Sequence, residues 1–285
     1  MYNTKVRTKQ GQAHCPCLCI CAICVNVKMN ETNKDERVDR VNENIIIKQR
    51  KGGLTFGTDA YLLYAYIRAQ KGAHALELGA GTGIISLLCL AKNKFADAYA
   101  VEIQDSFASL IAENAAANAL SDRLFPICKD LREISVNDIG GQLDIVLANP
   151  PYMRAGSGAH NQNDEKNIAR REIFGDIGDF CAAAKRMLRF GGSFYAVYRA
   201  DRTTDLLSAM RENGIEPKRL TYVCADQGSA PVLLLCEGRR GGSAGIFVTR
   251  PLIMHKDASA SVLEDTPELN YIYEKGEFDD SFVRK

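Results

Sequence analysis

Short apolar runs alternate with amphipathic segments along most of the chain. Between residues 75 and 211, the apolar runs have the length and continuity of buried strands, and the segments between them carry hydrophobic residues at helical spacing. Strands that are apolar throughout are typical of a parallel sheet covered by helices on both faces. The predicted strands are residues 75–78, 96–103, 124–128, 143–148 and 193–198, and the predicted helices are residues 84–92, 105–118, 177–188 and 203–211.

Two later apolar runs, residues 219–225 and 232–236, have no long helix between them. A connection this short predicts an antiparallel hairpin that closes one edge of the sheet. With the five earlier strands, the pattern therefore predicts an α/β fold with a seven-stranded, mostly parallel sheet. Glycines 191 and 192 are expected to end the helix before the fifth strand.

Composition places this sheet in one main domain. The chain has 285 residues, of which 46% are hydrophobic and 25% charged, which are ordinary values for a globular protein. Its 36 basic and 35 acidic side chains exclude a protein that coats nucleic acid with a uniformly basic surface, but they allow a local basic patch. We expect a domain over residues 42–255, an extension over residues 1–41, and a peripheral acidic tail over residues 256–285.

The cysteines fall into two groups. Five occur singly in apolar runs, which favours free thiols in a reducing, cytoplasmic protein. The other five crowd into residues 15–24, after a basic start, and allow three interpretations. This stretch could be a signal peptide, a metal or redox site built on the Cys21–Cys24 pair, or an accessory extension that precedes a start at Met29.

A glycine-rich turn follows the first predicted strand. The sequence from Glu77 to Gly83 places glycines at 79, 81 and 83, directly before a predicted helix. Such a turn lets the backbone approach a ligand closely at a helix N-terminus. Because a carboxylate at Glu77 would repel a pyrophosphate, the motif favours a ligand with a cationic amino-acid end, such as S-adenosylmethionine.

Two further acids end the next predicted strands. Glu102 lies 19 residues beyond Gly83, where a carboxylate can accept both ribose hydroxyls of a nucleoside, although an acid at a strand end can also simply face water. Asp130 follows the third strand and could accept an adenine amino group. It could equally cap a short helix over residues 131–134.

The sharpest motif is Asn149-Pro150-Pro151-Tyr152, directly after the buried strand at 143–148. Ligands of parallel α/β sheets bind at the carboxyl ends of the strands. Two prolines cannot donate hydrogen bonds and have a fixed φ, so their rigid carbonyls and the Asn149 side-chain oxygen can accept, while Tyr152 offers a face for stacking. The motif predicts a socket for a planar group bearing an NH2, the alternative being a plain turn that ends a strand.

Together these residues resemble the class I S-adenosylmethionine-dependent methyltransferases, whose fold is Rossmann-like, and within them the branch that methylates nitrogens through Asn-Pro-Pro-Tyr. The resemblance covers about residues 42–255. Phe-Gly-Thr-Asp-Ala at 56–60, Ala-Arg at 169–170 and Pro-Val-Leu-Leu at 231–234 resemble the bacterial tRNA(Val) adenine-N(6) methyltransferases. That family methylates the adenine on the 3′ side of the anticodon, so an RNA substrate, a transferase activity and no metal are implied.

The resemblance also implies roles for individual residues. Residues 56–60 would close over the cofactor, the glycine turn would hold its methionine portion, and Asn149 to Tyr152 would hold the target base. The implied cofactor-binding residues are Thr58, Asp59, Glu77, Gly79, Gly81, Gly83, Glu102, Asp130 and Asn149. The candidate RNA-binding residues come from basic clusters, each of which could instead be a solvated face: Arg170 and Arg171, Lys48 and Arg50, and Arg199 with Arg202. Of these, Arg170 matches the family position. Some relatives have a basic tail for RNA, whereas the tail of this chain is acidic.

Other functions share parts of this pattern. Glutamine methyltransferases that act on release factors use the same motif, but about 45 residues before the core are too few for their helical substrate-recognition domain. Methylation of a base in ribosomal RNA or DNA would use identical core chemistry. A dehydrogenase is disfavoured by the glycine spacing, and a non-catalytic binding module by the presence of both the glycine turn and the socket.

Overall fold

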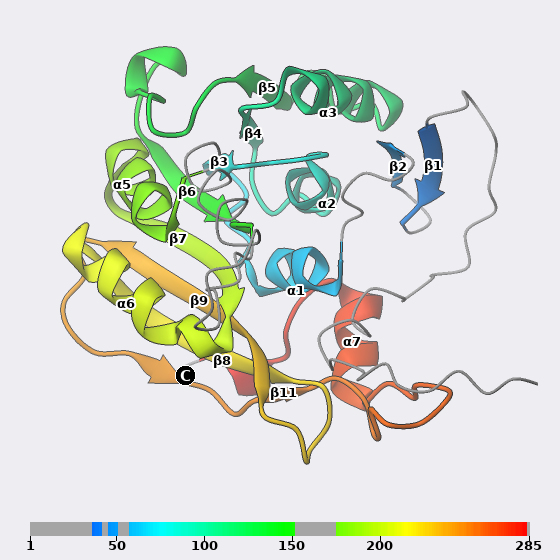
Figure 1. The fold of residues 1–285 in the computed structure, drawn as a ribbon. Helices are drawn as coiled ribbons and strands as arrows, with labels where there is room; N and C mark the ends of the chain where they lie inside the picture. Colours follow the sequence, from blue (N-terminus) through cyan, green and yellow to red (C-terminus); the bar gives the residue numbers. More distant parts are fainter. Residues whose placement is uncertain (1–35, 42–44, 51–56, 152–174, 284–285) are drawn as a thin grey trace, which may run out of the picture.

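A nine-stranded sheet forms the centre of the computed structural model, which describes residues 36–41, 45–50, 57–151 and 175–283 (Figure 1). The strands run in the order β10-β8-β9-β7-β6-β3-β4-β5, and β11 also pairs with β8. The strands of this sheet are β3 (His74–Leu78), β4 (Asp97–Glu102), β5 (Leu124–Cys128), β6 (Leu143–Ala148), β7 (Leu188–Arg199), β8 (Ile215–Cys224), β9 (Pro231–Arg240), β10 (Phe247–Val248) and β11 (Leu252–Ile253). The helices in the described part of the chain lack the length and hydrophobicity of a membrane span.

The strand directions confirm the predicted α/β architecture. Strands β5, β4, β3, β6 and β7 pair in parallel, and β9 runs antiparallel to both β7 and β8. Seven strands, β3 to β9, therefore match the predicted sheet and its hairpin. The hairpin is extended by β10 and β11, two strands of two residues each that pair in parallel with β8.

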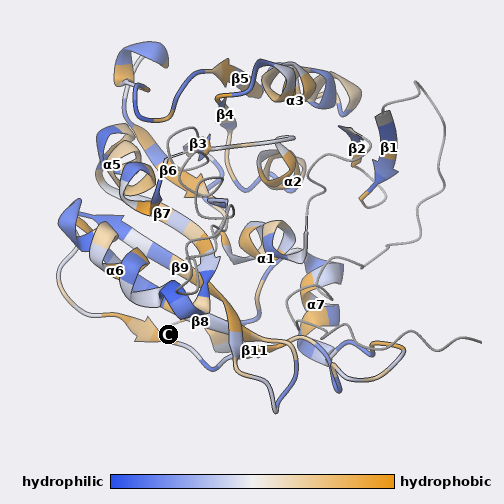
Figure 2. Cartoon of the chain, in the orientation of Figure 1, coloured by the Kyte–Doolittle hydropathy of each residue, from blue (hydrophilic) through white to orange (hydrophobic). Residues whose placement is uncertain are grey.

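Helices cover both faces of the sheet, as expected for strands that are apolar on both sides. Successive residues of β3 point to opposite faces, so that Ala75 belongs to one hydrophobic cluster and Leu76 to the other. Figure 2 shows that the helices carry hydrophilic and hydrophobic residues side by side. The first cluster takes in α1 (Thr58–Tyr66), α2 (Ile84–Ala91), α3 (Asp105–Ala117) and α7 (Pro267–Lys275), and the second takes in α5 (Ile177–Met187) and α6 (Thr203–Glu212).

Glycines 191 and 192 do not separate helix from strand, contrary to the prediction. Helix α5 ends at Met187, Leu188 adopts an extended conformation, and β7 begins at once and runs through both glycines. An added Cβ at Gly192 would lie 3.0 Å from the backbone oxygens of Asp144 and Arg189. The glycine therefore allows close approach of two strands rather than a helix stop.

A separate two-stranded sheet lies outside the predicted elements. Strands β1 (Glu36–Arg40) and β2 (Ile46–Arg50) pair antiparallel, and β2 packs along α3 (Figure 1). The domain boundary expected at residue 42 therefore falls between two paired strands. The described part of the extension and the start of the main domain form one hairpin.

The acidic C-terminal segment is packed rather than peripheral. Its helix α7 begins after the N-cap Thr266, with Pro267 in its first turn, and ends at Gly276 in a left-handed conformation. Four of the segment's hydrophobic side chains are buried in the first cluster, namely Leu269, Ile272, Phe278 and Phe282. The charges that suggested a solvated tail lie on one side of a segment whose other side is apolar.

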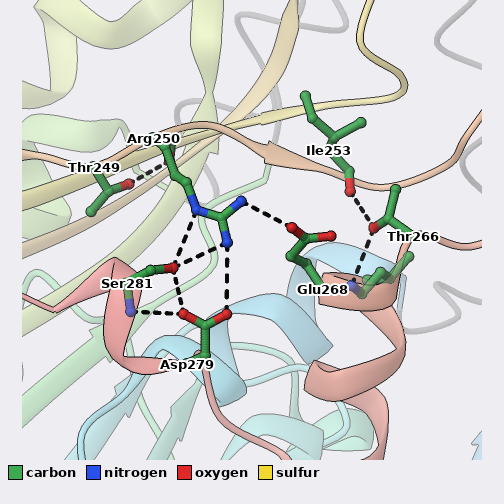
Figure 3. A network of polar contacts seen from close by, with 8 residues as sticks. Thr249, Arg250, Ile253, Thr266, Glu268, Asp279 and Ser281 are labelled. Atoms are coloured by element: carbon green, nitrogen blue, oxygen red, sulfur yellow. Dashed lines mark hydrogen bonds and ion pairs between the residues drawn. The ribbon is translucent and has the colours of Figure 1, made fainter.

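One arginine holds this segment to the sheet (Figure 3). The guanidinium of Arg250 donates to Glu268 Oε1 at 3.0 Å and to the Ser281 hydroxyl at 3.0 and 3.2 Å. It also lies 3.7 Å from Asp279 and stacks 4.5 Å from the centre of the Phe282 ring. Arg250 thus ties the residues next to β11 to the first turn of α7 and to the residues that follow this helix.

Candidate active site

The glycine turn joins β3 to α2 and has the backbone conformation that its sequence predicts. Gly79, Gly81 and Gly83 have φ angles of 66°, 54° and 75°, in the left-handed region. An added Cβ at Gly83 would lie 3.1 Å from the Ile111 side chain, whereas at Gly81 it would meet nothing within 4 Å. The turn therefore packs on α3 at one end and borders open space at Gly81.

Glu102, at the end of β4, lies beside this turn. Its Oε2 accepts from the Gly81 N–H at 2.9 Å and its Oε1 from the Gln104 N–H at 3.0 Å, and the residue is only 5% exposed. The Ala80 N–H also donates to the Val101 carbonyl at 3.0 Å. A carboxylate oxygen can accept more than one hydrogen bond, so these contacts leave Glu102 able to accept ribose hydroxyls as well.

Glu77 lies beneath the turn and is 2% exposed. Its Oε2 accepts from both the backbone N–H and the hydroxyl of Ser86 in α2. Burial raises the pKa of the Glu77 carboxyl to about 7, although the bonds from Ser86 oppose the rise. The side chain thus fixes the start of α2, and its predicted contact with the methionine portion of the cofactor stays a prediction.

Asp130 follows β5, and its carboxylate is engaged by a neighbour. Arg132 donates to it from Nε at 2.9 and 3.0 Å and from its backbone N–H at 2.8 Å. These bonds, above all those from the guanidinium, lower the pKa of Asp130. The following residues form a turn rather than a helix, so the alternative role as a helix cap is wrong. Its contact with an adenine stays a prediction.

Asn149 lies next to the glycine turn. Leu78 and Ala148 are partners in the β3–β6 register, so the residues that follow them, Gly79 and Asn149, leave the same edge of the sheet on neighbouring strands. Adjacent strands are about 4.8 Å apart. Of the rest of the motif, Pro150 is buried and Pro151 exposed, while Tyr152 lies outside the described residues.

A hydrogen bond joins this motif to a second predicted segment. The Asn149 side-chain Nδ2 donates to Asp59 Oδ2 at 3.1 Å, across 90 residues of sequence. Asp59 stands in the first turn of α1, and its Oδ1 accepts from the Ala60 N–H at 2.8 Å. Thr58, which begins α1, is buried. Burial raises the pKa of the Tyr273 phenol, and a hydrogen bond with the Thr58 side chain opposes this rise. The structure thus brings residues from α1, the glycine turn and the Asn-Pro-Pro motif together.

A cavity of about 230 Å³ adjoins the two prolines. It is lined by Pro150, Pro151, Tyr198, Arg202 and neighbouring residues at the start of α5. A larger cavity of about 710 Å³ lies elsewhere, between the C-terminal end of α1 and the residues after α7. Of these two cavities, the smaller one touches the motif.

The predicted RNA-binding residues lie in different surroundings. Lys48 forms an ion pair with Glu113 at 2.9 Å. Arg50 is the last residue of β2, and Arg170 and Arg171 lie outside the described residues. Arg199 pairs with Asp201, and Arg202 pairs with Asp205. Among the described residues, no cluster of three or more His, Cys, Asp or Glu side chains could hold a metal ion.

Two asparagines, Asn114 in α3 and Asn118 at its C-cap, support the site, and the sequence pattern did not identify them. Asn114, which is fully buried, accepts from the Lys48 N–H at 2.7 Å and donates to the carbonyls of Lys48 at 3.2 Å and Thr82 at 3.1 Å. Asn118, one turn later, exchanges the same pair of bonds with Ile46. The available signal was two asparagines at i, i+4 in an otherwise alanine-rich helix.

Comparison with known proteins agrees with this geometry. Residues 51–213 match the family model of the methyltransferase small domain. A protein of Bacteroides fragilis named tRNA1(Val) (adenine(37)-N6)-methyltransferase is 26% identical over 181 residues, which cover 64% of this chain and 75% of the relative. A protein of the same name from Porphyromonas gingivalis is 28% identical over 204 residues, covering 70% of this chain and 79% of the relative.

Solved structures share the fold. A predicted O-methyltransferase of Agrobacterium tumefaciens, Atu636, superposes with a TM-score of 0.61 at 18% identity, covering 78% of this chain and 98% of that protein. TYW2 of M. jannaschii, solved in complex with AdoMet, has a TM-score of 0.50 at 15% identity, covering 76% of this chain and 91% of that protein.

Proposed function

This chain belongs to the methyltransferase small domain family and is an S-adenosylmethionine-dependent methyltransferase, and we propose that it methylates the exocyclic amine of an adenine in tRNA. The observation that carries the proposal is the position of Asn149, beside Gly79 at the shared edge of β3 and β6 and bonded to Asp59. That position holds an amide acceptor next to the turn that suits the cofactor.

The residues around the turn fit this cofactor. The backbone at Gly81 borders open space, so a ligand can approach it where any side chain would intrude. Glu102 presents a buried carboxylate to the same turn, in the position where ribose hydroxyls are bound in related folds. Thr58 and Asp59 would close the site from α1. When bound, the cofactor supplies a methyl group made electrophilic by its sulfonium.

The Asn-Pro-Pro-Tyr motif would position the substrate amine and would not act as a general base. The Asn149 side-chain oxygen and the Pro150 carbonyl would accept the two hydrogens of the adenine amine, which localises the nitrogen lone pair. Pro150 is buried and lacks an N–H, so its carbonyl is held rigidly. Alignment of this kind can lower a barrier by several kcal/mol, and the proton can leave after methylation, so no general base is required.

The names of the relatives support the finer part of the proposal. We infer that the substrate is tRNA(Val) and the target the adenine at position 37, as those names state for the relatives. An anticodon-loop base costs less to unstack than a base in a duplex. Lys48, Arg50, Arg170 and Arg171 are the proposed phosphate contacts. The proposal includes the cytoplasmic location expected from the isolated cysteines. Of these, Cys89, Cys181, Cys224 and Cys236 are buried free thiols, and Cys128 is an exposed one.

Labelled S-adenosylmethionine tests the proposal when it is offered with total tRNA, ribosomal RNA, DNA and release factor in parallel. We expect label in tRNA, released as N6-methyladenosine after digestion. The Asn149→Ala variant should bind the cofactor normally but lose turnover. Label in release factor alone, or in ribosomal RNA or DNA alone, would overturn the proposed substrate, and full activity of Asn149→Ala would overturn the role of the motif.

A further inference from the structure

The bond between Asp59 and Asn149 has a direction. A carboxylate only accepts hydrogen bonds, so the group that Asn149 turns toward Asp59 must be its NH2. In a planar amide the oxygen then lies on the other side of the carbon. Without such a partner, an asparagine side chain can rotate by half a turn and exchange its donor and acceptor positions.

We infer that Asp59 is a positioning residue, which sets the amide orientation of Asn149 so that the acceptor oxygen faces the substrate amine. This inference rests on the proposed function, because only a substrate that donates hydrogens requires an oxygen there. With the amide reversed, Asn149 would present an NH2 to the substrate NH2, and two donors cannot bond each other.

Asp59 is well held for this task. One of its oxygens accepts from the Ala60 N–H at 2.8 Å, so the carboxylate is anchored to the first turn of α1. Helix α1 is itself buried along most of its length. On its exposed side Tyr61 donates to the Tyr273 carbonyl of α7 at 3.1 Å, and the two rings pack edge to face. The carboxylate therefore has a fixed position relative to β6.

Exchanging the two groups gives a sharp test. In Asp59→Asn, position 59 is no longer a pure acceptor and so no longer requires the NH2 of Asn149 on its side, and in Asn149→Asp two carboxylates oppose each other. In the double variant, the new amide at position 59 can donate to the new carboxylate at position 149, whose second oxygen can accept from the substrate. Each single variant should lose about tenfold or more in kcat, and the double variant should recover about tenfold over Asn149→Asp.

Two further measurements separate positioning from cofactor binding or folding. Asp59 is here assigned to Asn149 rather than to the cofactor contact that the family resemblance implies, so the Kd for S-adenosylmethionine should stay within about twofold of wild type in Asp59→Asn. Asp105→Asn should leave kcat unchanged. Asp105 is the matched control because it is an exposed acid in the first turn of α3. In NMR spectra, the side-chain NH2 signals of Asn149 should be protected from exchange in wild type and lose this protection in Asp59→Asn.

Three results would overturn the inference. They are wild-type kcat in Asp59→Asn, a double variant no better than Asn149→Asp, and Asn149 amide signals that do not respond to the change at Asp59. The NMR result is independent of the substrate. If wild type methylates none of the offered RNAs but the amide signals respond as expected, the proposed function fails and the orientation by Asp59 stands.

Discussion

Two glycines of the cofactor turn differ in what surrounds them, although both have positive φ angles. At Gly83 a methyl group would press on Ile111, and at Gly81 it would enter open space. The backbone strain of a non-glycine residue, about 1–2 kcal/mol, applies to both. The two positions therefore separate the structural function of the turn from its function in binding.

We expect Gly81→Ala to lower the affinity for S-adenosylmethionine at least tenfold while it costs about 1 kcal/mol of stability. Gly83→Ala should cost about 2 kcal/mol or more, because overpacking against Ile111 adds to the strain. Urea unfolding and cofactor titration of both variants check this. Equal loss of affinity with equal loss of stability would contradict the distinction.

Burial of Glu77 predicts a dependence of stability on pH. The pKa of its carboxyl is raised from the usual 4.5 to about 7, so the folded state binds more protons than the unfolded state between these values. This contribution is complete below pH 4.5 and is lost as the pH rises through 7. The free energy of unfolding of wild type, relative to Glu77→Gln, should therefore fall by up to about 3 kcal/mol over that range.

Urea unfolding at pH 5, 6, 7 and 8 measures this difference. The Gln variant is the reference because it keeps an oxygen that can accept from Ser86 but does not titrate. A difference between the two proteins that is constant with pH would show that Glu77 ionises normally in the folded state.

The residues of the site were predictable where local sequence determines their place. Glu102 ends one predicted strand and Asn149 directly follows another, so the sheet edge at which they lie follows from the strand pattern alone. Partners such as Asp59 for Asn149 and Ser86 for Glu77 were not predictable in the same way. Those contacts depend on the distance between elements after packing, which no local spacing encodes.

At the scale of elements, α3 connects the β1–β2 hairpin to the cofactor turn. Asn114 bonds both β2 and the Thr82 carbonyl, whereas Asn118 bonds β2 and the Asn114 carbonyl but not the cofactor turn. Each asparagine side chain offers one acceptor and one donor, so it bonds the backbone at the edge of β2 as a neighbouring strand would.

Alanine at each position should distinguish the two connections. Asn114→Ala should cost about 2–3 kcal/mol and weaken cofactor binding, because it leaves buried backbone groups without partners on both sides. Asn118→Ala should cost about 1 kcal/mol and leave cofactor affinity unchanged. Hydrogen exchange should accelerate at the Lys48 amide in the first variant and at the Ile46 amide in the second. An unchanged cofactor affinity in Asn114→Ala would contradict the connection to the turn.

Strands and helices of the central sheet were predictable because their patterns are long and regular. The β1–β2 hairpin and helix α7 were not predicted, for a physical reason. Their sequences are mostly polar, and only one side of each is buried, against another element. For such short segments tertiary packing outweighs intrinsic propensity. Short strands of two residues, such as β10, have no pattern to detect.

At the scale of the whole molecule, the C-terminal segment braces the helix that carries Asp59. Arg250 holds the segment, and Tyr273 of α7 contacts Tyr61 of α1. Arg250→Ala should therefore lower the free energy of unfolding by about 1–2 kcal/mol, because the contacts of Arg250 with Glu268, Ser281 and Asp279 are lost together. It should also speed proteolysis after residue 255.

Lys256→Ala is the matched control for this prediction. Lys256 pairs with Glu264 in the same region, but both side chains are more than half exposed. Loss of such a surface pair costs at most about 0.5 kcal/mol. If limited proteolysis, followed by mass spectrometry, treats both variants alike, the Arg250 network does not hold the segment.

The packing of the C-terminal segment on α1 has a practical consequence for anyone who handles the enzyme. Phe282 packs against Phe278, which packs against Tyr66 of α1, so trimming the chain before Phe278 would expose buried rings of that helix. Assays on trimmed protein should then underestimate turnover, and comparison with the full chain would reveal by how much.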